Sequence, residues 1–222
     1  MDKREFKITS DGSHTLYVPH LDETYHSKHG AIQEALHVFI DAGLNHYKKS
    51  ELNILEIGFG TGLNTFLTLL EAEKKGIKIN YTGIEAFPLG KEIIKRLNYT
   101  SELNLSEKAI ELFNKLHKTE WEGEYEITPS FILNKIQIEL DKFNTEKKFD
   151  VIYFDAFGPR VQPEMWTKQI LKNMYNCLSE KGVLVTYCAK GSVKRTLKEV
   201  GFELEALPGP LGKREMTRAK KL

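Results

Sequence analysis

The feature that most constrains the fold is a glycine-rich turn between an apolar run and a helical pattern. Residues 52–57 read LNILEI, a short apolar run that predicts a buried strand. Gly58, Gly60 and Gly62 follow it directly, and an apolar periodicity typical of a helix begins at Leu63. A strand, a glycine turn and a helix in this order predict a site where a ligand lies against backbone without side chains.

Strands and helices continue to alternate along the chain, which predicts an α/β fold with a doubly wound, mostly parallel sheet. Further strands are expected at 79–85, 125–128, 149–155 and 182–189. A C-terminal antiparallel hairpin is expected to pair 202–207 with 216–219. Helices are expected at 32–43, 63–70, 89–97, 106–116, 164–178 and 192–200, with a further helix ending near Leu140.

The 222 residues are expected to form one domain, because no internal repeat or low-complexity linker divides them. Residues 1–50 are predicted to form an N-terminal lid segment, irregular up to 29 except for a short hairpin near Asp11 and Gly12. Residues 98–123 are predicted to be a helical elaboration of the domain.

Composition excludes several classes of protein. No apolar run approaches the roughly 18 residues of a membrane span, and the N-terminus lacks the apolar segment of a secretory signal. The two cysteines, Cys177 and Cys188, lie in segments expected to be buried, and the seven histidines show no ligand-like spacing. We therefore expect a cytoplasmic protein with reduced cysteines, no membrane contact and no metal.

Charge is distributed unevenly along the chain. Residues 187–222 carry nine basic and four acidic side chains, a net charge of +5, whereas the rest of the chain is at −4. A basic end is compatible with a partner that carries phosphates, and a solubilising tail explains it equally well. Lys213, Arg214 and Arg218 are the candidates for phosphate contacts.

Three carboxylates are expected near the glycine turn. Glu56, inside the first strand, is expected to bond backbone amides of the turn or to favour the ammonium of a methionyl group, and it would repel a pyrophosphate. Glu85 ends the second strand, where a carboxylate can accept both hydroxyls of a ribose. Asp155 ends a later strand, across the ligand from the turn, where it can accept hydrogen bonds from an amine or act as a general base. The plain alternative is a solvated carboxylate for Glu85 and a loop-capping one for Asp155.

The spacing of the glycines separates the candidate ligands. A dinucleotide fingerprint requires a glycine where this chain has Leu63, and the turn contains no Walker lysine. The motif G-x-G-x-G preceded by Glu56 therefore favours S-adenosylmethionine over NAD.

Several motifs together resemble one family. They are LEIGFGTGLN at 55–64, IEAFP at 84–88 and YFDAFGPRVQPEMWT at 153–167, with ETYHS at 23–27 and GKREM at 212–216. This combination resembles the tRNA 5-aminomethyl-2-thiouridine methyltransferases, which form the methyltransferase half of bifunctional MnmC-type enzymes. The resemblance spans nearly the whole chain.

The resemblance implies a Rossmann-like class I fold that uses S-adenosylmethionine. It implies N-methylation of the aminomethyl group of 5-aminomethyl(-2-thio)uridine at the wobble position of the tRNA anticodon loop. It assigns the catalytic aspartate to Asp155 and the cofactor-site glutamate to Glu85. The full set of expected cofactor-binding residues is Glu56, Gly58, Phe59, Gly60, Thr61, Gly62, Asn64, Glu85 and Asp155. The expected substrate-binding residues are Tyr25 and His26 in the lid, and Lys213, Arg214 and Arg218.

Two departures from the family matter. The bifunctional enzymes carry an FAD-dependent oxidase that this chain lacks, so we expect a separate oxidase or upstream tRNA-modifying enzymes to supply the free aminomethyl form. Relatives often have Gly-Asp near the adenine, where this chain has Pro129, Ser130 and Phe131. Stacking on Phe131 or a backbone contact is the expected substitute. Trp166 lies on an apolar helical stripe and is expected in the core rather than stacked on a base.

Two other classes remain open. An aminopropyltransferase of the spermidine-synthase type shares this fold, but the chain shows no second strand-end aspartate cluster for a polyamine. A non-catalytic protein that binds tRNA or cofactor on a methyltransferase fold is the other. The intact glycine turn, with Glu56, Glu85 and Asp155, argues against it.

Overall fold

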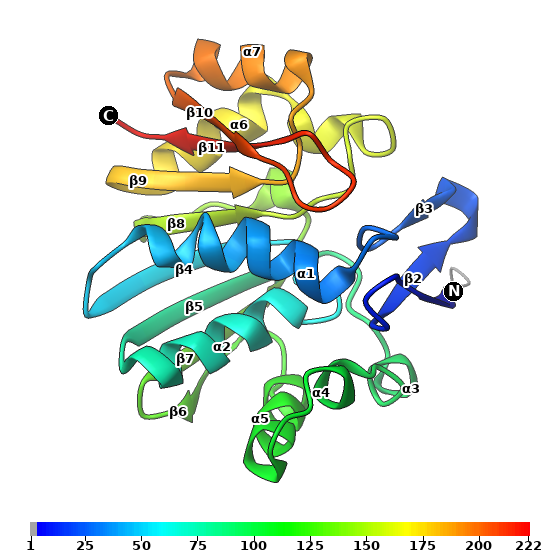
Figure 1. The fold of residues 1–222 in the computed structure, drawn as a ribbon. Helices are drawn as coiled ribbons and strands as arrows, with labels where there is room; N and C mark the ends of the chain where they lie inside the picture. The colour runs from blue at the N-terminus through cyan, green and yellow to red at the C-terminus, as the bar shows by residue number, and fades with distance from the viewer. Residues whose placement is uncertain (1–3) are drawn as a thin grey trace.

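The computed structural model describes residues 4–222, and its centre is an eight-stranded sheet (Figure 1). The strand order is β10-β11-β9-β8-β4-β5-β7-β6. The five inner parallel strands are β4 (Glu51–Ile57), β5 (Lys78–Glu85), β7 (Phe131–Gln137), β8 (Phe149–Phe154) and β9 (Leu178–Thr186). Antiparallel strands complete the two edges: β6 (Gly123–Thr128) on one side, and β11 (Glu215–Lys220) with β10 (Glu203–Pro208) on the other.

The chain reverses its direction of travel across the sheet at β4. It runs from β4 to β5 and β7 on one side, then returns to β8 and β9 on the other. Ile57 at the end of β4 pairs with Phe154 at the end of β8. The two strand ends therefore meet at a topological switch point, which is where open α/β sheets bind ligands.

Helices cover both faces of the sheet, which explains why all six residues of β8 are buried. One face packs against α1 (Ala31–Ala35), the π-helical turn η2 (Leu36–Asp41), α2 (Leu63–Lys75) and α5 (Glu107–Lys118). The other face packs against α6 (Lys168–Cys177) and α7 (Gly191–Val200). Two short helices, α3 (Lys91–Ile94) and α4 (Tyr99–Glu102), lie between β5 and α5.

The N-terminal segment is a small sheet, not the irregular segment expected from the sequence. β1 (Glu5–Ile8), β2 (His14–Val18) and β3 (Glu23–Thr24) pair antiparallel, beyond the carboxyl ends of the inner strands (Figure 1). The predicted hairpin at Asp11 and Gly12 is confirmed as the turn between β1 and β2. Residues 31–46 pack in the core, so only residues 4–30 of the predicted lid reach over the sheet edge. Residues 1–3 lie outside the described residues.

The predicted helix ending near Leu140 is wrong, because this stretch is strand β7. Three predicted helices also differ in extent. The helix at 89–97 is only the single turn α3, and the one at 164–178 starts as a 3₁₀ turn before Thr167 caps α6. The helix at 32–43 becomes π-helical after Ala35, which leaves Leu36 partly exposed.

The predicted helix cap, hairpin and buried residues are confirmed. Ser106 caps α5 by accepting a hydrogen bond from the Ala109 amide, and the C-terminal hairpin is β10–β11. Cys177 and Cys188 are buried and unpaired, and Trp166 lies in the core. Within residues 4–222, no helix is long and apolar enough to span a membrane. The same residues contain no cluster of histidine, cysteine or carboxylate side chains arranged to hold a metal ion.

Candidate active site

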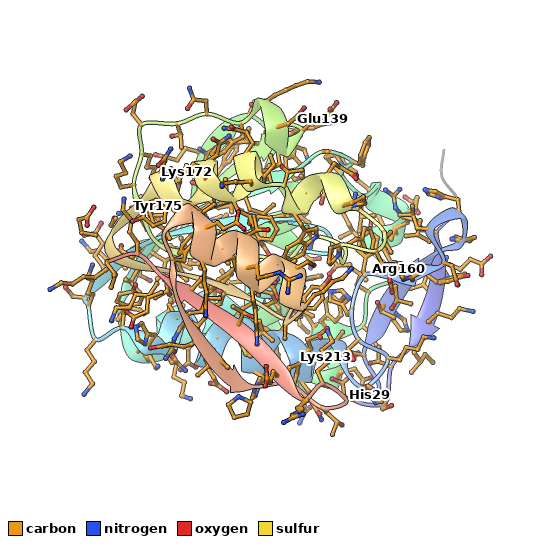
Figure 2. All side chains as sticks on the ribbon, turned by 90° about the horizontal axis from the view of Figure 1, so that it is seen from above. His29, Glu139, Arg160, Lys172, Tyr175 and Lys213 are labelled. Atoms are coloured by element: carbon orange, nitrogen blue, oxygen red, sulfur yellow. The ribbon has the colours of Figure 1, made fainter. Side chains whose placement is uncertain are left out.

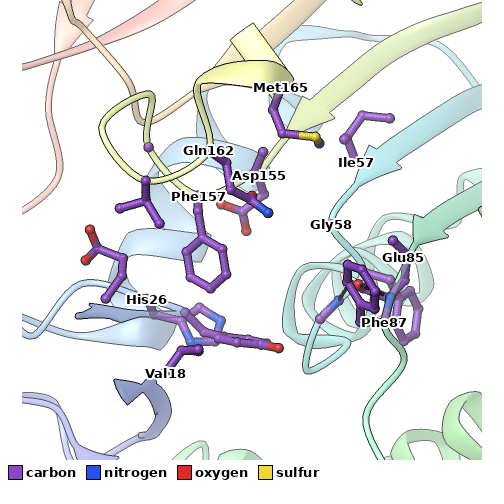
Figure 3. A pocket seen from close by; sticks show the side chains of 18 of the residues that line it. Val18, His26, Ile57, Gly58, Glu85, Phe87, Asp155, Phe157, Gln162 and Met165 are labelled. Carbon is purple, nitrogen blue, oxygen red and sulfur yellow. Dashed lines mark hydrogen bonds between the residues drawn. The ribbon is translucent and has the colours of Figure 1, made fainter. Parts of the chain in front are cut away.

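A cavity of about 1300 Å³ opens where β4, β5, β7 and β8 end. Figure 3 shows Asp155 and Phe157 on one side of it, with Gly58, Glu85 and Phe87 on the other. Residues 18–29 of the N-terminal segment and Lys213 of the C-terminal hairpin close it further. The volume exceeds the roughly 300–1000 Å³ typical of a site for one small molecule, so it has room for a cofactor and part of a substrate.

The glycine turn is fixed by its neighbours. The amides of Gly58 and Phe59 both donate to the Ile84 carbonyl at 3.0 Å, which ties the turn to the end of β5. Gly58 has φ +88, and a Cβ there would lie 2.6 Å from the carbonyl oxygen of Asp155. Only glycine fits between the two strand ends, so the turn and Asp155 are packed backbone to backbone.

Glu85 is oriented by two backbone amides. Its Oε2 accepts from the Gly60 amide at 3.0 Å, and its Oε1 accepts from the Phe87 amide at 2.9 Å. A carboxylate has about four acceptor sites, so each oxygen keeps one for a ligand. Because Glu85 lines the cavity, it presents a pre-oriented acceptor pair of the kind that binds two adjacent hydroxyls.

Asp155 is a buried carboxyl group whose surroundings disfavour its ionised form. Burial raises its pKa to about 7, and a hydrogen bond from Asn64 Nδ2 to its Oδ2, at 2.8 Å, opposes this rise. The charge of Glu34 raises the pKa further, whereas the charge of Lys213 lowers it. A carboxyl that titrates near neutral pH can exchange a proton with a bound amine.

The structure corrects the role expected for Glu56. Its side chain is fully buried, does not line the cavity, and accepts from Thr65 Oγ1 at 2.8 Å instead of from the turn amides. Its Oε1 has no hydrogen-bond partner among the described residues, and burial raises its pKa to about 8. Gly62 also lies away from the cavity, against the ring of His117. The other expected cofactor residues do line it: Gly58, Phe59, Gly60, Thr61, Asn64, Glu85 and Asp155.

Tyr25 and His26 both line the cavity from the N-terminal segment. The Tyr25 ring packs edge-on against Phe157, with ring centroids 5.3 Å apart, and its hydroxyl accepts from Arg4 Nε at 3.0 Å. His26 Nδ1 lies 3.1 Å from Thr15 Oγ1. Burial lowers the pKa of His26 to about 4, so the ring is neutral at pH 7.

Two of the three cations expected to contact phosphate are engaged inside the protein. Lys213 lines the cavity and pairs with Glu34 at 2.6 Å. Arg218 pairs with Glu205 at 2.5 Å and donates to the Ala42 carbonyl at 3.1 Å. Arg214 is exposed and forms no ion pair within the described residues. Of the three, only Arg214 is free to meet a phosphate in this structure.

The expectation that Phe131 stacks on adenine is wrong. Phe131 is fully buried at the amino end of β7, stacked on Tyr81 with centroids 5.6 Å apart, at the far edge of the sheet from the cavity. The carboxyl end of β7 leads instead into residues 137–141, all of which line the cavity. Sequence reasoning missed them because it assigned β7 as a helix.

Several other lining residues were also missed. Phe87, Phe157, Gln162 and Met165 lie in motifs that the sequence does single out, whereas Tyr187 carried no signal of its own. Phe87 is two-thirds exposed at the rim, at 66%.

Comparison with known proteins identifies the family to which the chain belongs. A family model described as S-adenosyl-L-methionine-dependent methyltransferase matches residues 100–222, more than half of the chain. The chain belongs to this methyltransferase family. Its cofactor is S-adenosylmethionine.

Two curated relatives show the extent of the similarity. The tRNA 5-methylaminomethyl-2-thiouridine biosynthesis bifunctional protein MnmC of Cupriavidus metallidurans is 30% identical over 96% of this chain and 33% of its own length. The protein of that name in Leptospira borgpetersenii is 32% identical over 90% of this chain and 32% of its own. The methyltransferase chain thus spans about a third of these curated relatives.

A solved structure agrees with the fold. A crystal structure of MNMC2 from Aquifex aeolicus superposes with a TM-score of 0.81 at 26% identity, covering 99% of this chain and 70% of that one. The class I methyltransferase fold expected from the sequence is therefore confirmed.

Proposed function

We propose that this methyltransferase, as a single domain over residues 1–222, N-methylates the aminomethyl group of 5-aminomethyl(-2-thio)uridine at the wobble position of tRNA. The product is 5-methylaminomethyl(-2-thio)uridine. The printed names of the relatives support the substrate. The observation that carries the reaction is Asp155, a carboxyl with a pKa of about 7 that faces the same cavity as Glu85 and the glycine turn.

The residues around the turn fit the cofactor. Glu85 has acceptor sites for the ribose hydroxyls, and Gly58 and Gly60 let a ligand approach the backbone. Residues 137–141 replace Phe131 as the neighbours of the adenine. When bound, S-adenosylmethionine supplies an activated methyl group. Glu56 supports the turn from within the core and makes no direct contact with the cofactor.

Asp155 holds the amine and accepts its proton. Asn64 occupies one side of Oδ2, which leaves Oδ1 to accept a hydrogen bond from the aminomethyl nitrogen. An amine must lose a proton to expose its lone pair, and a carboxylate that titrates near pH 7 is matched to that transfer. Asp155 thereby orients the lone pair toward the cofactor side of the cavity.

The remaining contribution is positioning. Tyr25, packed on Phe157, and the neutral His26 form the wall contributed by the N-terminal segment, which excludes water and restricts the base. Holding two reactants in register can supply on the order of 7–11 kcal/mol of a barrier. An anticodon-loop base is unpaired, so it enters such a cavity without the cost of opening a duplex.

Contacts outside the cavity are fewer than the sequence implied. Arg214 contacts a phosphate of the anticodon loop, and Lys213 acts within the cavity. Because only one of the three cations is free, tRNA affinity should fall with salt less steeply than three phosphate contacts would require. In the cytoplasm, a separate oxidase or other upstream tRNA-modifying enzymes supply the aminomethyl form.

The alternatives are not favoured. The matched family is described by S-adenosylmethionine dependence, not by the decarboxylated relative that an aminopropyltransferase uses. A non-catalytic binding protein has no need of a carboxyl tuned to neutral pH at the end of β8.

Nucleoside mass spectrometry tests the proposal. tRNA carrying 5-aminomethyluridine is incubated with the protein and S-adenosylmethionine, beside Asp155→Ala and Asp155→Asn. We expect one methyl group gained on that nucleoside with the wild type. Both variants should lose at least about 100-fold in rate, as removal of a general base does, while still binding S-adenosylhomocysteine in calorimetry. Cofactor binding without methyl gain in the wild type would rule out this substrate.

A further inference from the structure

Lys213 is a cation built into the cavity wall. Its Nζ lies 2.6 Å from Glu34 Oε1 and 3.9 Å from the centroid of the Tyr187 ring. The side chain is one-third exposed, at 33%, and lines the cavity. An ion pair and a cation–π contact together hold this ammonium in one place.

The partners of Lys213 are themselves fixed. Glu34 is buried, and its Oε2 accepts from the Ser27 amide at 2.8 Å. Tyr187 donates its hydroxyl proton to the Ala156 carbonyl at 2.8 Å, one residue after Asp155. The backbone of Gly212, the residue before Lys213, lies against the ring of His29. Figure 2 labels Lys213 and His29 next to each other. The ammonium is therefore preorganised, and little side-chain entropy is left to lose on binding.

Lys213 and Asp155 line the same cavity. The Lys213 charge is one of the groups that lower the pKa of Asp155, so the two side chains are electrostatic neighbours across the cavity. An ammonium has three N–H donors. Glu34 accepts one and the Tyr187 ring faces another, so one donor remains for a ligand. The same cavity thus offers a hydrogen-bond donor and an acceptor.

We propose that Lys213 donates a hydrogen bond to the C4 carbonyl oxygen of the uracil ring while Asp155 holds the neighbouring aminomethyl group. This inference rests on the proposed function. In 5-aminomethyluridine the C4 carbonyl and the C5 substituent are adjacent, so the edge presents an acceptor beside a donor. That pattern complements Lys213 and Asp155. Cytosine carries an amino donor at C4, which would meet the ammonium donor to donor.

Lys213 lies in the C-terminal motif GKREM, for which the sequence predicted phosphate contacts. A phosphate contact by Lys213 would add affinity for any RNA but would not distinguish bases. A contact with the C4 carbonyl makes Lys213 a specificity-determining residue, because the wrong base sets an amino donor against the ammonium and offers no acceptor for its third N–H.

The test uses two anticodon stem-loop RNAs that differ only at the wobble base, one with 5-aminomethyluridine and one with 5-aminomethylcytidine. The rate of methyl transfer, as kcat/KM, is measured for the wild type, Lys213→Met and Arg214→Met. Methionine keeps the length and apolar stem of lysine without its charge. Arg214 is the matched control, because it is the adjacent cation and points to solvent.

We expect the wild type to prefer the uridine substrate. Lys213→Met should lower kcat/KM for uridine by about 10- to 100-fold, the usual worth of a hydrogen bond to a charged group, and should reduce the uridine-to-cytidine ratio by a similar factor. Arg214→Met should lower kcat/KM for both substrates equally and leave the uridine-to-cytidine ratio unchanged. Binding of S-adenosylhomocysteine should be unaltered in both variants.

Loss of Lys213 also leaves Glu34 buried without its counter-charge, so Glu34→Gln/Lys213→Met is measured beside it. The double variant should keep the altered ratio if base recognition is the cause. An unchanged ratio in both Lys213 variants, or a wild type with no preference for uridine, would overturn the inference. Failure of the wild type to methylate either RNA despite binding cofactor would instead overturn the proposed function.

Discussion

Asn64 lowers the proton affinity of Asp155, the residue on which the proposed chemistry depends. Its amide donates to Asp155 Oδ2 at 2.8 Å, which stabilises the ionised carboxylate and opposes the effect of burial on the pKa. Without this bond the pKa of Asp155 should rise above its value of about 7. In Asn64→Ala, the acid limb of kcat/KM should therefore move to higher pH.

The measurement is a pH–rate profile for the wild type and Asn64→Ala between pH 5.5 and 9, at saturating cofactor. Ionisation of the substrate amine contributes equally to both profiles, so the difference between them reports on Asp155. Because Asn64 also lines the cavity, S-adenosylhomocysteine affinity is measured at each pH as the control. An acid limb that stays in place or moves to lower pH would contradict this role of Asn64.

Glu56 makes stability depend on pH in a direction opposite to that of most carboxylates. Burial raises its pKa from 4.5 to about 8, so the folded state binds more protons than the unfolded state between these values. The free energy of unfolding therefore falls as pH rises from about 4.5 to about 8, and the penalty is complete above pH 8. Gln cannot ionise, so Glu56→Gln should be more stable than the wild type at pH 9, by on the order of 5 kcal/mol.

Urea unfolding at pH 5, 7 and 9 measures this difference. It should be near zero at pH 5 and largest at pH 9. The same difference at every pH would mean that Glu56 acts through packing and hydrogen bonding alone.

These residues also show what the sequence can predict of the site. Glu85 and Asp155 lie at strand ends, where topology alone brings them to the ligand edge. Glu56 lies one residue before a strand end, and the alternation of the strand turns it toward α2 and Thr65. Lys213 pairs with Glu34, a residue from the opposite end of the chain, and no local pattern predicts such a pair. Arg218 instead lies directly opposite its partner Glu205 in the β10–β11 hairpin.

At the scale of elements, the glycine turn is constrained by its contact with the next strand. Gly58 and Gly76 both have positive φ, at +88 and +65, but a Cβ at Gly58 would meet the Asp155 carbonyl at 2.6 Å, whereas nothing lies within 4 Å of one at Gly76. Gly76→Ala should therefore cost only the left-handed backbone strain, about 1–2 kcal/mol. Gly58→Ala must also separate β4 from β8.

We expect Gly58→Ala to lose more stability in urea unfolding than Gly76→Ala. At temperatures where both variants are folded, Gly58→Ala should weaken S-adenosylhomocysteine binding by at least about tenfold, a loss of 1.4 kcal/mol, and Gly76→Ala should leave it unchanged. Equal affinities in the two variants would show that the turn tolerates movement of its first residue.

Strand β7 explains why one element escaped prediction. Its buried positions alternate as a strand requires, at Phe131, Leu133 and Lys135, but the last of these is a lysine, so the apolar pattern breaks. Lys135 Nζ donates to the Leu116 carbonyl at 3.2 Å and the Thr119 carbonyl at 2.5 Å, at the end of α5. A cation at a helix C-terminus is satisfied there. The strands β4, β5, β8 and β9, whose buried positions are mostly apolar, were all predicted.

At the scale of the whole molecule, the cavity is closed by segments from opposite ends of the chain. Glu34 pairs with Lys213 at 2.6 Å, His37 Nε2 donates to the Pro208 carbonyl at 2.8 Å, and Arg160 pairs with Glu23 at 3.2 Å. These contacts join residues 23–37 to the C-terminal hairpin and to the loop after β8. Such closure depends on tertiary packing, so the sequence predicted a lid but not what it closes against.

The same contacts predict how the molecule unfolds. Phe6 of β1 packs against the core cluster that contains Ile54 and Tyr81 of the sheet, so the N-terminal segment is not a separate unit. Calorimetry should give a single transition, with calorimetric and van't Hoff enthalpies equal. S-adenosylhomocysteine at about 100 times its Kd should add about 2.7 kcal/mol, which raises the Tm by about 5–10 °C for a chain of this size. An earlier transition that the ligand does not shift would show that the N-terminal segment opens independently, and the cavity would then be gated by that opening.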